Sequence, residues 1–171
     1  MDRATRSGFE NLKARAARWA NEEEVRIGWT STLEGVLGVH FDAERSRKDS
    51  SYNNVIIEYK SPGLFGGSAT SPAFREAMED RLKRYVQKAA RAEGLAEEDY
   101  IGIAIDGEHV AFAQLRRGQI EHQGLIPFCD ASFSMVVEAC RANYRRAITA
   151  ENLSADFGHR SPHGIAAMQA L

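Results

Sequence analysis

Three charged side chains that lie close together in the sequence could jointly hold a divalent cation beside a phosphate group. Asp49 precedes Glu58 and Lys60 in the spacing Asp-x8-Glu-x-Lys. Carboxylate oxygens are the hard ligands that Mg²⁺ accepts in proteins, while an ammonium group can orient or activate a water molecule and offset negative charge that develops on a phosphate. This combination of residues is what hydrolysis of a phosphodiester with a magnesium ion requires.

The element that must position Glu58 and Lys60 is an extended segment over residues 55–63. It begins with an apolar, β-branched run and stops at a Pro-Gly pair, which is typical of a strand that enters a core and ends at a turn. Because side chains alternate along a strand, Glu58 and Lys60 fall on one face, and Ile57 and Tyr59 on the other. Charges on an interior strand must be paired, hydrated or bound to a metal. Glu-x-Lys is also common on the wet face of an edge strand, and that alternative stays open.

Acidic residues at the start of a helix add a further candidate. Residues 8–37 have a helical pattern, and Asn21 followed by three glutamates indicates that a second helix begins there and ends at Gly38. Glu22 falls on the inward face at the start of this helix, and Glu23 follows it. Acids at a helix N-terminus also interact favourably with the helix dipole, so a solvated Glu22 is the alternative.

The rest of the pattern predicts one α/β domain over residues 1–150, with 151–171 as a tail or the start of a linker to another domain. Alternating residues over 39–43 indicate a first strand, and a polar connection that carries Asp49 follows it. The later elements are, in order, a helix over 72–93 capped by Ser71 and closed by Gly94, strands over 101–105 and 110–113, a short strand over 119–123, and a helix from Asp130 to about residue 148.

Composition excludes several classes of protein. The 171 residues are 43% hydrophobic and 27% charged, with a net charge of −2, as in ordinary globular domains and unlike charge-driven nucleic-acid binders. Basic clusters at 45–48 and 81–84 can still provide phosphate contacts. No apolar run approaches the length of a bilayer span and no signal-peptide core is present, so we expect a cytoplasmic protein with no membrane partner. Cys129 and Cys140 match no zinc spacing, and we expect reduced thiols.

Several of these residues, read in order, carry a family resemblance: Glu22-x-x-Val25-Arg26, Lys48-Asp49, the run from Asn53 to Gly63, and Tyr85. With them the chain resembles the PD-(D/E)xK nuclease superfamily. It looks like the N-terminal endonuclease domain of fused restriction-modification enzymes, in which the nuclease precedes an adenine-specific DNA methyltransferase, and it is also similar to the nuclease part of type I restriction subunits. The usual proline before the aspartate is replaced here by Lys48.

The resemblance implies a restriction-endonuclease-like mixed β-sheet flanked by α-helices, and a Mg²⁺-dependent endodeoxyribonuclease in which Mn²⁺ can substitute. It implies that Asp49 and Glu58 hold the metal, that Lys60 lies at the attacking water, and that Glu22, or Glu23 in its place, is an accessory acid. Its implied partners are DNA, a methyltransferase or specificity domain in the same chain, and a second copy of the chain for double-strand cleavage.

The resemblance also points to the helix over 72–93, where many relatives place a glutamine four residues before a tyrosine. Here Arg81 stands four residues before Tyr85, and Arg81, Tyr85 and Lys48 become candidate substrate-binding residues. Arg81 could equally pair with Glu79 or another acid on the helix surface.

Two other classes of function compete with the nuclease. A non-catalytic nucleic-acid-binding or assembly module on the same fold would use the charged strand only to contact phosphate or to close an ion pair. A purely structural α/β domain would pair Glu58 with Lys60 on a wet sheet face. Metal dependence separates these alternatives, because only the nuclease needs Mg²⁺.

Overall fold

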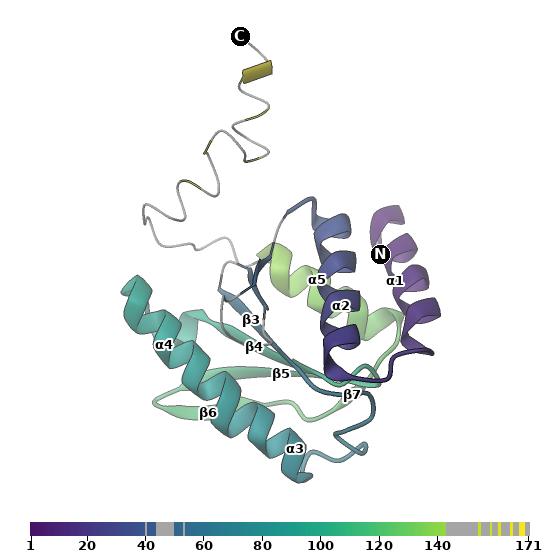
Figure 1. The fold of residues 1–171 in the computed structure, drawn as a ribbon. Helices are drawn as coiled ribbons and strands as arrows, with labels where there is room; N and C mark the ends of the chain where they lie inside the picture. The colour runs from purple at the N-terminus through teal and green to yellow at the C-terminus, as the bar shows by residue number, and fades with distance from the viewer. Residues whose placement is uncertain are drawn as a thin grey trace.

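The fold is a mixed β-sheet with helices on both faces (Figure 1). The computed structural model describes residues 1–39, 41–43, 50–52 and 54–142, together with the single positions 154, 158, 161, 165, 168 and 169. The α/β class predicted from the sequence is confirmed. Asp49 and Lys48, the expected boundary at residue 150 and the end of the last predicted helix lie outside the described residues. Within the described part of the chain, no helix is long and apolar enough to cross a membrane.

The sheet has the strand order β1-β2-β3-β4-β5-β6, and β7 pairs with β5 away from this path. β3 and β4 are parallel, and the other pairs are antiparallel. The strands are β1 Asp42–Ala43, β2 Ser50–Tyr52, β3 Val55–Tyr59, β4 Ile101–Ile105, β5 His109–Arg116, β6 Gln119–His122 and β7 Ile126–Pro127. β1 is shorter than expected, because Val39 lies in a bend before it. The strands expected over 101–105 and 110–113 are present as the antiparallel pair β4–β5.

One face of the sheet is covered by α1 (Arg3–Ala16), α2 (Glu22–Leu37) and α5 (Asp130–Ala142) (Figure 1). The core on this face contains Ile57 and Tyr59 of β3 packed with Trp29 of α2 and with Phe133 of α5. These side chains are buried, and Ile57 and Phe133 each contribute about 1.5–3 kcal/mol of favourable transfer free energy.

The other face is covered by one long helical segment made of α3 (Pro72–Arg75), the π-helix η1 (Glu76–Leu82) and α4 (Lys83–Glu93). A 3₁₀ turn, η2 (Glu97–Asp99), leads from it to β4. The core on this face contains Ile56 of β3 together with Met78 and Leu82. A Cβ atom on Gly102 of β4 would lie 3.2 Å from Leu82 Cδ1, so η1 packs closely on the strand next to β3.

The predicted helix caps are present. The Asn21 side chain accepts a hydrogen bond from the Glu24 N–H at the start of α2, and the Ser71 hydroxyl accepts one from the Phe74 N–H at the start of α3. Gly38 and Gly94 end α2 and α4 in the left-handed conformation, which a residue without a Cβ adopts at little cost.

The π-helix was not predicted, and it changes which residues the helical segment buries. In the sequence, Phe74, Met78, Leu82, Tyr85 and Ala89 recur at helical spacing, which predicts that all five share one buried face. The side chains of Tyr85 and Ala89 are half-buried, and the fully buried positions are Val86 and Ala90. A step of four residues drifts about 40° around an ideal α-helix. The wider turn of a π-helix absorbs part of this drift and keeps a four-residue repeat facing the sheet.

Candidate active site

The end of β3 carries the candidate residues to the face under η1. The predicted alternation is confirmed, since Ile56 packs under η1 whereas Ile57 and Tyr59 pack under α2. Lys60 directly follows β3, and its backbone N–H donates to the carbonyl of Ile105 at 2.8 Å, which aligns it with the end of β4. Lys60 Nζ lies 3.1 Å from Glu58 Oε1.

This pair does not lie on a wet sheet face. The Glu58 and Lys60 side chains are only 5% and 8% exposed, and β3 is flanked on both sides by other strands. The alternative predicted a solvent-exposed ion pair on an edge strand. The ion pair is present, but it is buried and lies on an inner strand. A buried carboxylate requires a compensating cation or hydrogen bonds, and the Lys60 ammonium meets part of this need.

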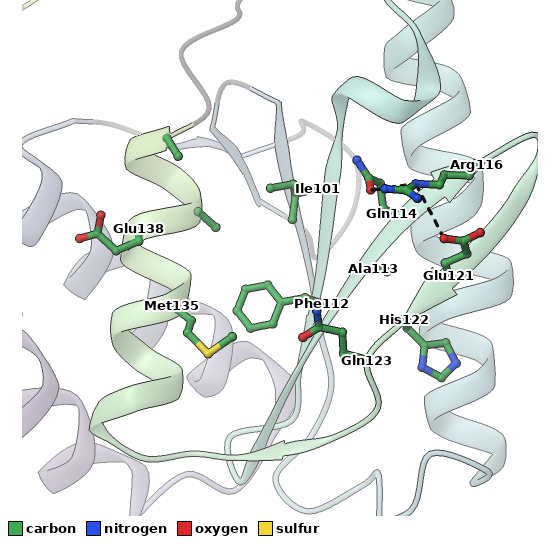
Figure 2. A pocket seen from close by; sticks show the side chains of 12 residues that line it. Ile101, Phe112, Ala113, Gln114, Arg116, Glu121, His122, Gln123, Met135 and Glu138 are labelled. Atoms are coloured by element: carbon green, nitrogen blue, oxygen red, sulfur yellow. Dashed lines mark hydrogen bonds and ion pairs between the residues drawn. The ribbon is translucent and has the colours of Figure 1, made fainter.

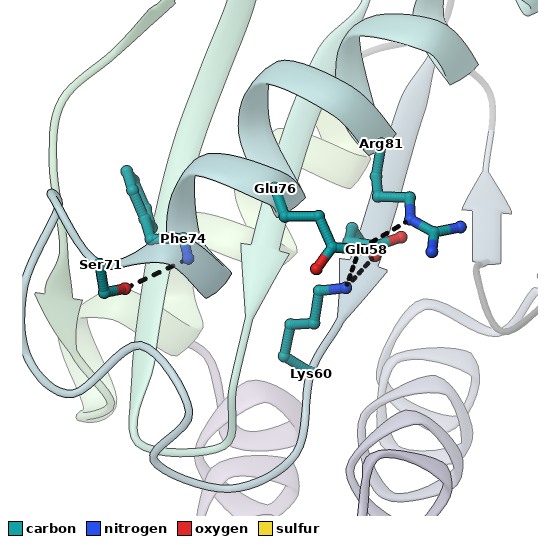
Figure 3. Close-up of polar contacts among 6 residues, drawn as sticks. All are labelled: Glu58, Lys60, Ser71, Phe74, Glu76 and Arg81. Atoms are coloured by element: carbon teal, nitrogen blue, oxygen red, sulfur yellow. Dashed lines mark hydrogen bonds and ion pairs between the residues drawn. The ribbon is translucent and has the colours of Figure 1, made fainter.

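Two side chains from η1 extend the pair into a network of four charges. Glu76 Oε1 lies 3.4 Å from Lys60 Nζ and 3.2 Å from Arg81 Nε (Figure 3). We call Glu58, Lys60, Glu76 and Arg81 the charged network. Figure 3 shows Glu76 reaching from the helix toward the gap between Lys60 and Arg81.

The π-helix explains how Glu76 and Arg81 come together. In an ideal α-helix, residues five apart are separated by roughly 140° around the axis. In a π-helix the backbone hydrogen bonds join residues five apart, so two such residues lie on the same side of the helix, as residues four apart do in an α-helix. η1 spans Glu76–Leu82 and contains both side chains. Sequence reasoning missed Glu76, because its contact with Arg81 depends on this unusual turn.

The charges of the network are mutually stabilised. Burial lowers the pKa of Lys60, but the nearby charges of Glu58 and then Glu76 outweigh this effect, and the pKa ends above its usual range. The hydrogen bond from Arg81, followed by the charge of Lys60, holds the pKa of Glu76 below its usual range. Lys60 is therefore an ammonium at neutral pH, able to donate hydrogen bonds and unable to accept a proton.

Arg81 and Tyr85, predicted together as substrate-binding residues, are neighbours in the structure. A hydrogen bond with Tyr85, and then the one with Glu76, raise the pKa of Arg81. The predicted pairing of Arg81 with an acid of its own helix is present, with Glu76 as the partner. The Arg81 side chain is still 33% exposed, which leaves its outer N–H groups accessible to a ligand.

Glu22 comes from the opposite face of the sheet. It is half-buried in the first turn of α2, and that helix packs on the Tyr59 side of β3. A Cβ on Gly107, just after β4, would lie 3.4 Å from Val25 Cγ2, so the start of α2 is at the same end of the sheet as Lys60. Glu23, its predicted substitute, is exposed and forms an ion pair with Arg26.

The buried carboxylate of Asp106 holds the segment that follows Lys60. Its Oδ2 accepts the Phe65 N–H at 2.8 Å, and its Oδ1 accepts the N–H groups of Glu108 and His109 at 3.1 and 2.7 Å. Its backbone carbonyl also accepts the Gly63 N–H at 3.0 Å. Asp106 is completely buried, so this structural anchor fixes the loop between β3 and α3.

The described residues fit one part of the expected magnesium site. Glu58 supplies a carboxylate, a hard ligand suited to Mg²⁺, at the carboxyl end of β3. Asp49, the other expected ligand, lies outside the described residues, and among those described no group of three Asp, Glu, His or Cys side chains could hold a metal. Ser50, which follows Asp49 in sequence, pairs with Ile57, which precedes Glu58. The sequence neighbours of the two expected ligands thus face one another across β2 and β3.

A separate hollow of about 700 Å³ lies between α5 and the strands β5 and β6 (Figure 2). Phe112 and Met135 face it, and Arg116 and Glu121 form an ion pair at its edge. None of the predicted site residues that the structure describes lines this hollow. The charged network therefore lies apart from this hollow.

Comparisons with protein families, with curated proteins and with solved structures found no match to this chain.

Proposed function

We propose that this chain is a metal-dependent nuclease module of restriction-endonuclease-like fold that hydrolyses DNA phosphodiester bonds. The observation that carries the proposal is the buried Glu58–Lys60 pair at the end of β3, with Nζ and Oε1 3.1 Å apart. The order of elements supports it as well, since α2 is followed by the antiparallel strands β1, β2 and β3, a helical segment, and β4 parallel to β3.

The proposed roles follow from chemistry and burial. Asp49 and Glu58 would hold Mg²⁺, which supplies Lewis-acid stabilisation of the negative charge on the reacting phosphate. Lys60, as a buried ammonium, would donate hydrogen bonds to a phosphate oxygen and to the attacking water, and so fix their relative positions. Arg81 would bind a phosphate through its exposed N–H groups. Glu22 would be an accessory acid that reaches around the sheet end from α2.

The cellular role that the resemblance suggests is cleavage of DNA in a restriction-modification enzyme. In that role the module would act with a methyltransferase or specificity domain in the same chain, and as a homodimer where both strands are cut. Two copies of the chain would be needed because one Glu58–Lys60 pair can act on only one phosphodiester bond at a time.

The proposal is tested by nicking of supercoiled plasmid in Mg²⁺, in Mn²⁺ and in EDTA. Glu58→Gln removes the ligand charge while Lys60 keeps Glu76 as a partner, and cleavage should fall about a hundredfold or more. The control is Glu79→Gln, which makes the same chemical change at an exposed glutamate of η1 outside the charged network. Cleavage by Glu58→Gln at the wild-type rate, or no metal-dependent cleavage by the wild-type chain, would overturn the proposal.

A second candidate is a nucleic-acid-binding or assembly module without catalysis. The charged network favours it in one respect, because Lys60 and Arg81 already balance Glu58 and Glu76 among the described residues without a bound cation. Such a module would bind DNA in EDTA with the affinity that it has in Mg²⁺ and would leave the DNA uncut.

A further inference from the structure

We propose that Lys60 and Arg81 form a binding site for one phosphate group of a nucleic-acid backbone, and that the carboxylate of Glu76 occupies this site until the phosphate displaces it. This inference rests on the proposed function in taking the ligand to be a nucleic acid. It adds a residue, Glu76, that regulates access to the candidate active site.

The geometry of Glu76 is that of an anion held between two cations. One oxygen, Glu76 Oε1, lies 3.4 Å from Lys60 Nζ and 3.2 Å from Arg81 Nε. A non-bridging oxygen of a phosphodiester has the same charge and accepts the same hydrogen bonds from ammonium and guanidinium groups. The two cations are thus already spaced to share a single anionic oxygen.

The four side chains differ in how freely they can leave. Lys60 and Glu58 are 8% and 5% exposed and belong to the end of a buried strand, whereas the Glu76 side chain is 44% exposed. A half-exposed carboxylate is already partly hydrated and gains further hydration when it rotates into water, and ion pairs of exposed residues are weak. Glu76 is therefore the member of the charged network that an incoming phosphate can replace.

The π-helix directs both Glu76 and Arg81 toward Lys60. Without the wide turn of η1, the two side chains would point about 140° apart around the helix, and only one of them could approach the end of β3. Such π segments are uncommon and occur frequently at functional sites. The site thus depends on the wide turn of η1, which also keeps Met78 and Leu82 buried against the sheet.

The surface beside the network can accommodate a nucleic-acid backbone. An open hollow of about 690 Å³ adjoins Glu76 and Arg81, and Lys83 and Arg84 also line it. These two residues provide cations for a neighbouring phosphate once one phosphate is bound at Arg81. Two acids outside the charged network, Glu79 and Asp80, line the same hollow.

The test is binding of a fluorescein-labelled DNA duplex, measured by anisotropy in EDTA so that cleavage cannot contribute. Glu76→Gln should bind the duplex about three- to tenfold more tightly than wild type, because its side chain no longer competes as an anion. Glu79→Gln removes the same charge from the same helical segment and controls for the general gain in positive potential. The DNA affinity of Glu79→Gln should exceed that of the wild type by less than twofold. Circular dichroism melting curves check that each variant is folded.

Arg81→Gln distinguishes displacement from a long-range charge effect. It should weaken binding, and Glu76→Gln should give no added affinity in the Arg81→Gln background. Equal gains from Glu76→Gln and Glu79→Gln, or a gain that survives without Arg81, would overturn this inference and leave the proposed nuclease untouched. If the variants show that Glu76 competes with DNA for the site but the wild type does not cleave DNA in Mg²⁺, the nuclease proposal alone would be overturned. Absence of DNA binding by every variant in EDTA would overturn this inference, and plasmid nicking in Mg²⁺ would still decide the nuclease separately.

Discussion

Replacing Lys60 by methionine leaves the carboxylate of Glu58 buried beside an apolar side chain. In the wild-type protein the two charged groups are 3.1 Å apart and only 8% and 5% exposed, so water screens their interaction weakly. Glu76 and Arg81 keep each other as partners in this variant, because their contact does not involve Lys60. The perturbation therefore removes the Lys60 ammonium from Glu58, while the attraction between the charges of Glu58 and Arg81 remains.

The expected loss of stability is large for one substitution. Removing one partner of a buried ion pair costs about 3–5 kcal/mol, since the remaining charge is uncompensated. For a domain of this size each kcal/mol lowers the melting temperature by about 2–4 °C, which predicts a drop on the order of 10 °C. The double variant Glu58→Gln/Lys60→Met has no buried charge at this position and should recover most of the loss. The coupling between the two substitutions should be about 2–4 kcal/mol.

Urea unfolding followed by circular dichroism at pH 7.5 measures all four proteins of this double-mutant cycle. The folded-state pKa of Lys60 is raised above its ordinary value of 10.5, so its stabilising contribution is complete below pH 10.5 and is lost as the pH rises through the raised value. The gap between wild type and Lys60→Met should therefore be constant from neutral pH to pH 10.5 and close above it. Single-variant losses that simply add, with a coupling below about 0.5 kcal/mol, would refute the reasoning.

Three further predictions concern other parts of the fold. Asp106→Ala removes the acceptor of three backbone N–H groups, including that of Phe65, and should destabilise the protein by about 3 kcal/mol or more in urea unfolding. Wild-type stability of this variant would contradict the anchoring role. Burial raises the pKa of Cys140 to about 12, whereas a backbone hydrogen bond from Ser132 lowers that of Cys129, so iodoacetamide at pH 8 should label only Cys129 in the native protein, as read by mass spectrometry. Rapid labelling of both Cys129 and Cys140 in the native protein would disprove this predicted selectivity. The Asp2 carboxylate caps α1, and its pKa is lowered from 3.8 to about 2 by the backbone N–H of Thr5 and then by Arg141 of α5. Asp2→Asn should therefore lower stability at neutral pH, with a deficit that shrinks between pH 3.8 and about 2, and a deficit unchanged at low pH would rule this out.

Strand periodicity and helix caps could be predicted from the sequence because they depend on neighbouring residues alone. The two faces of β3 follow from the alternation of side chains, which placed Glu58 with Ile56 and opposite Ile57. The start of α2 follows from the Asn21 side chain, whose amide oxygen accepts a backbone N–H that the helix cannot satisfy. These features require no knowledge of what packs against them.

The partner of Lys60 on the helical segment could not be predicted in the same way. Glu76 is distant from Lys60 in sequence, and its approach depends on a π-helix that intrinsic helix propensities do not indicate. A signal was nevertheless present, since Met78, Leu82 and Val86 recur in steps of four. A strict four-residue repeat turns away from a flat sheet in an ideal α-helix, and it suits a helix with a wider turn.

The sum of charges in the network connects the proposed catalysis with the proposed role of Glu76. Glu58 and Glu76 balance Lys60 and Arg81, so the described network is neutral before any ligand binds. A phosphodiester brings one more negative charge into a region where Glu58 and Lys60 are shielded from water. If Glu76 turns into solvent as the phosphate enters, the region stays neutral, whereas an anion added beside Glu76 would be repelled. Exchange of one anion for another therefore lets Lys60 meet the phosphate while it still compensates the buried charge of Glu58.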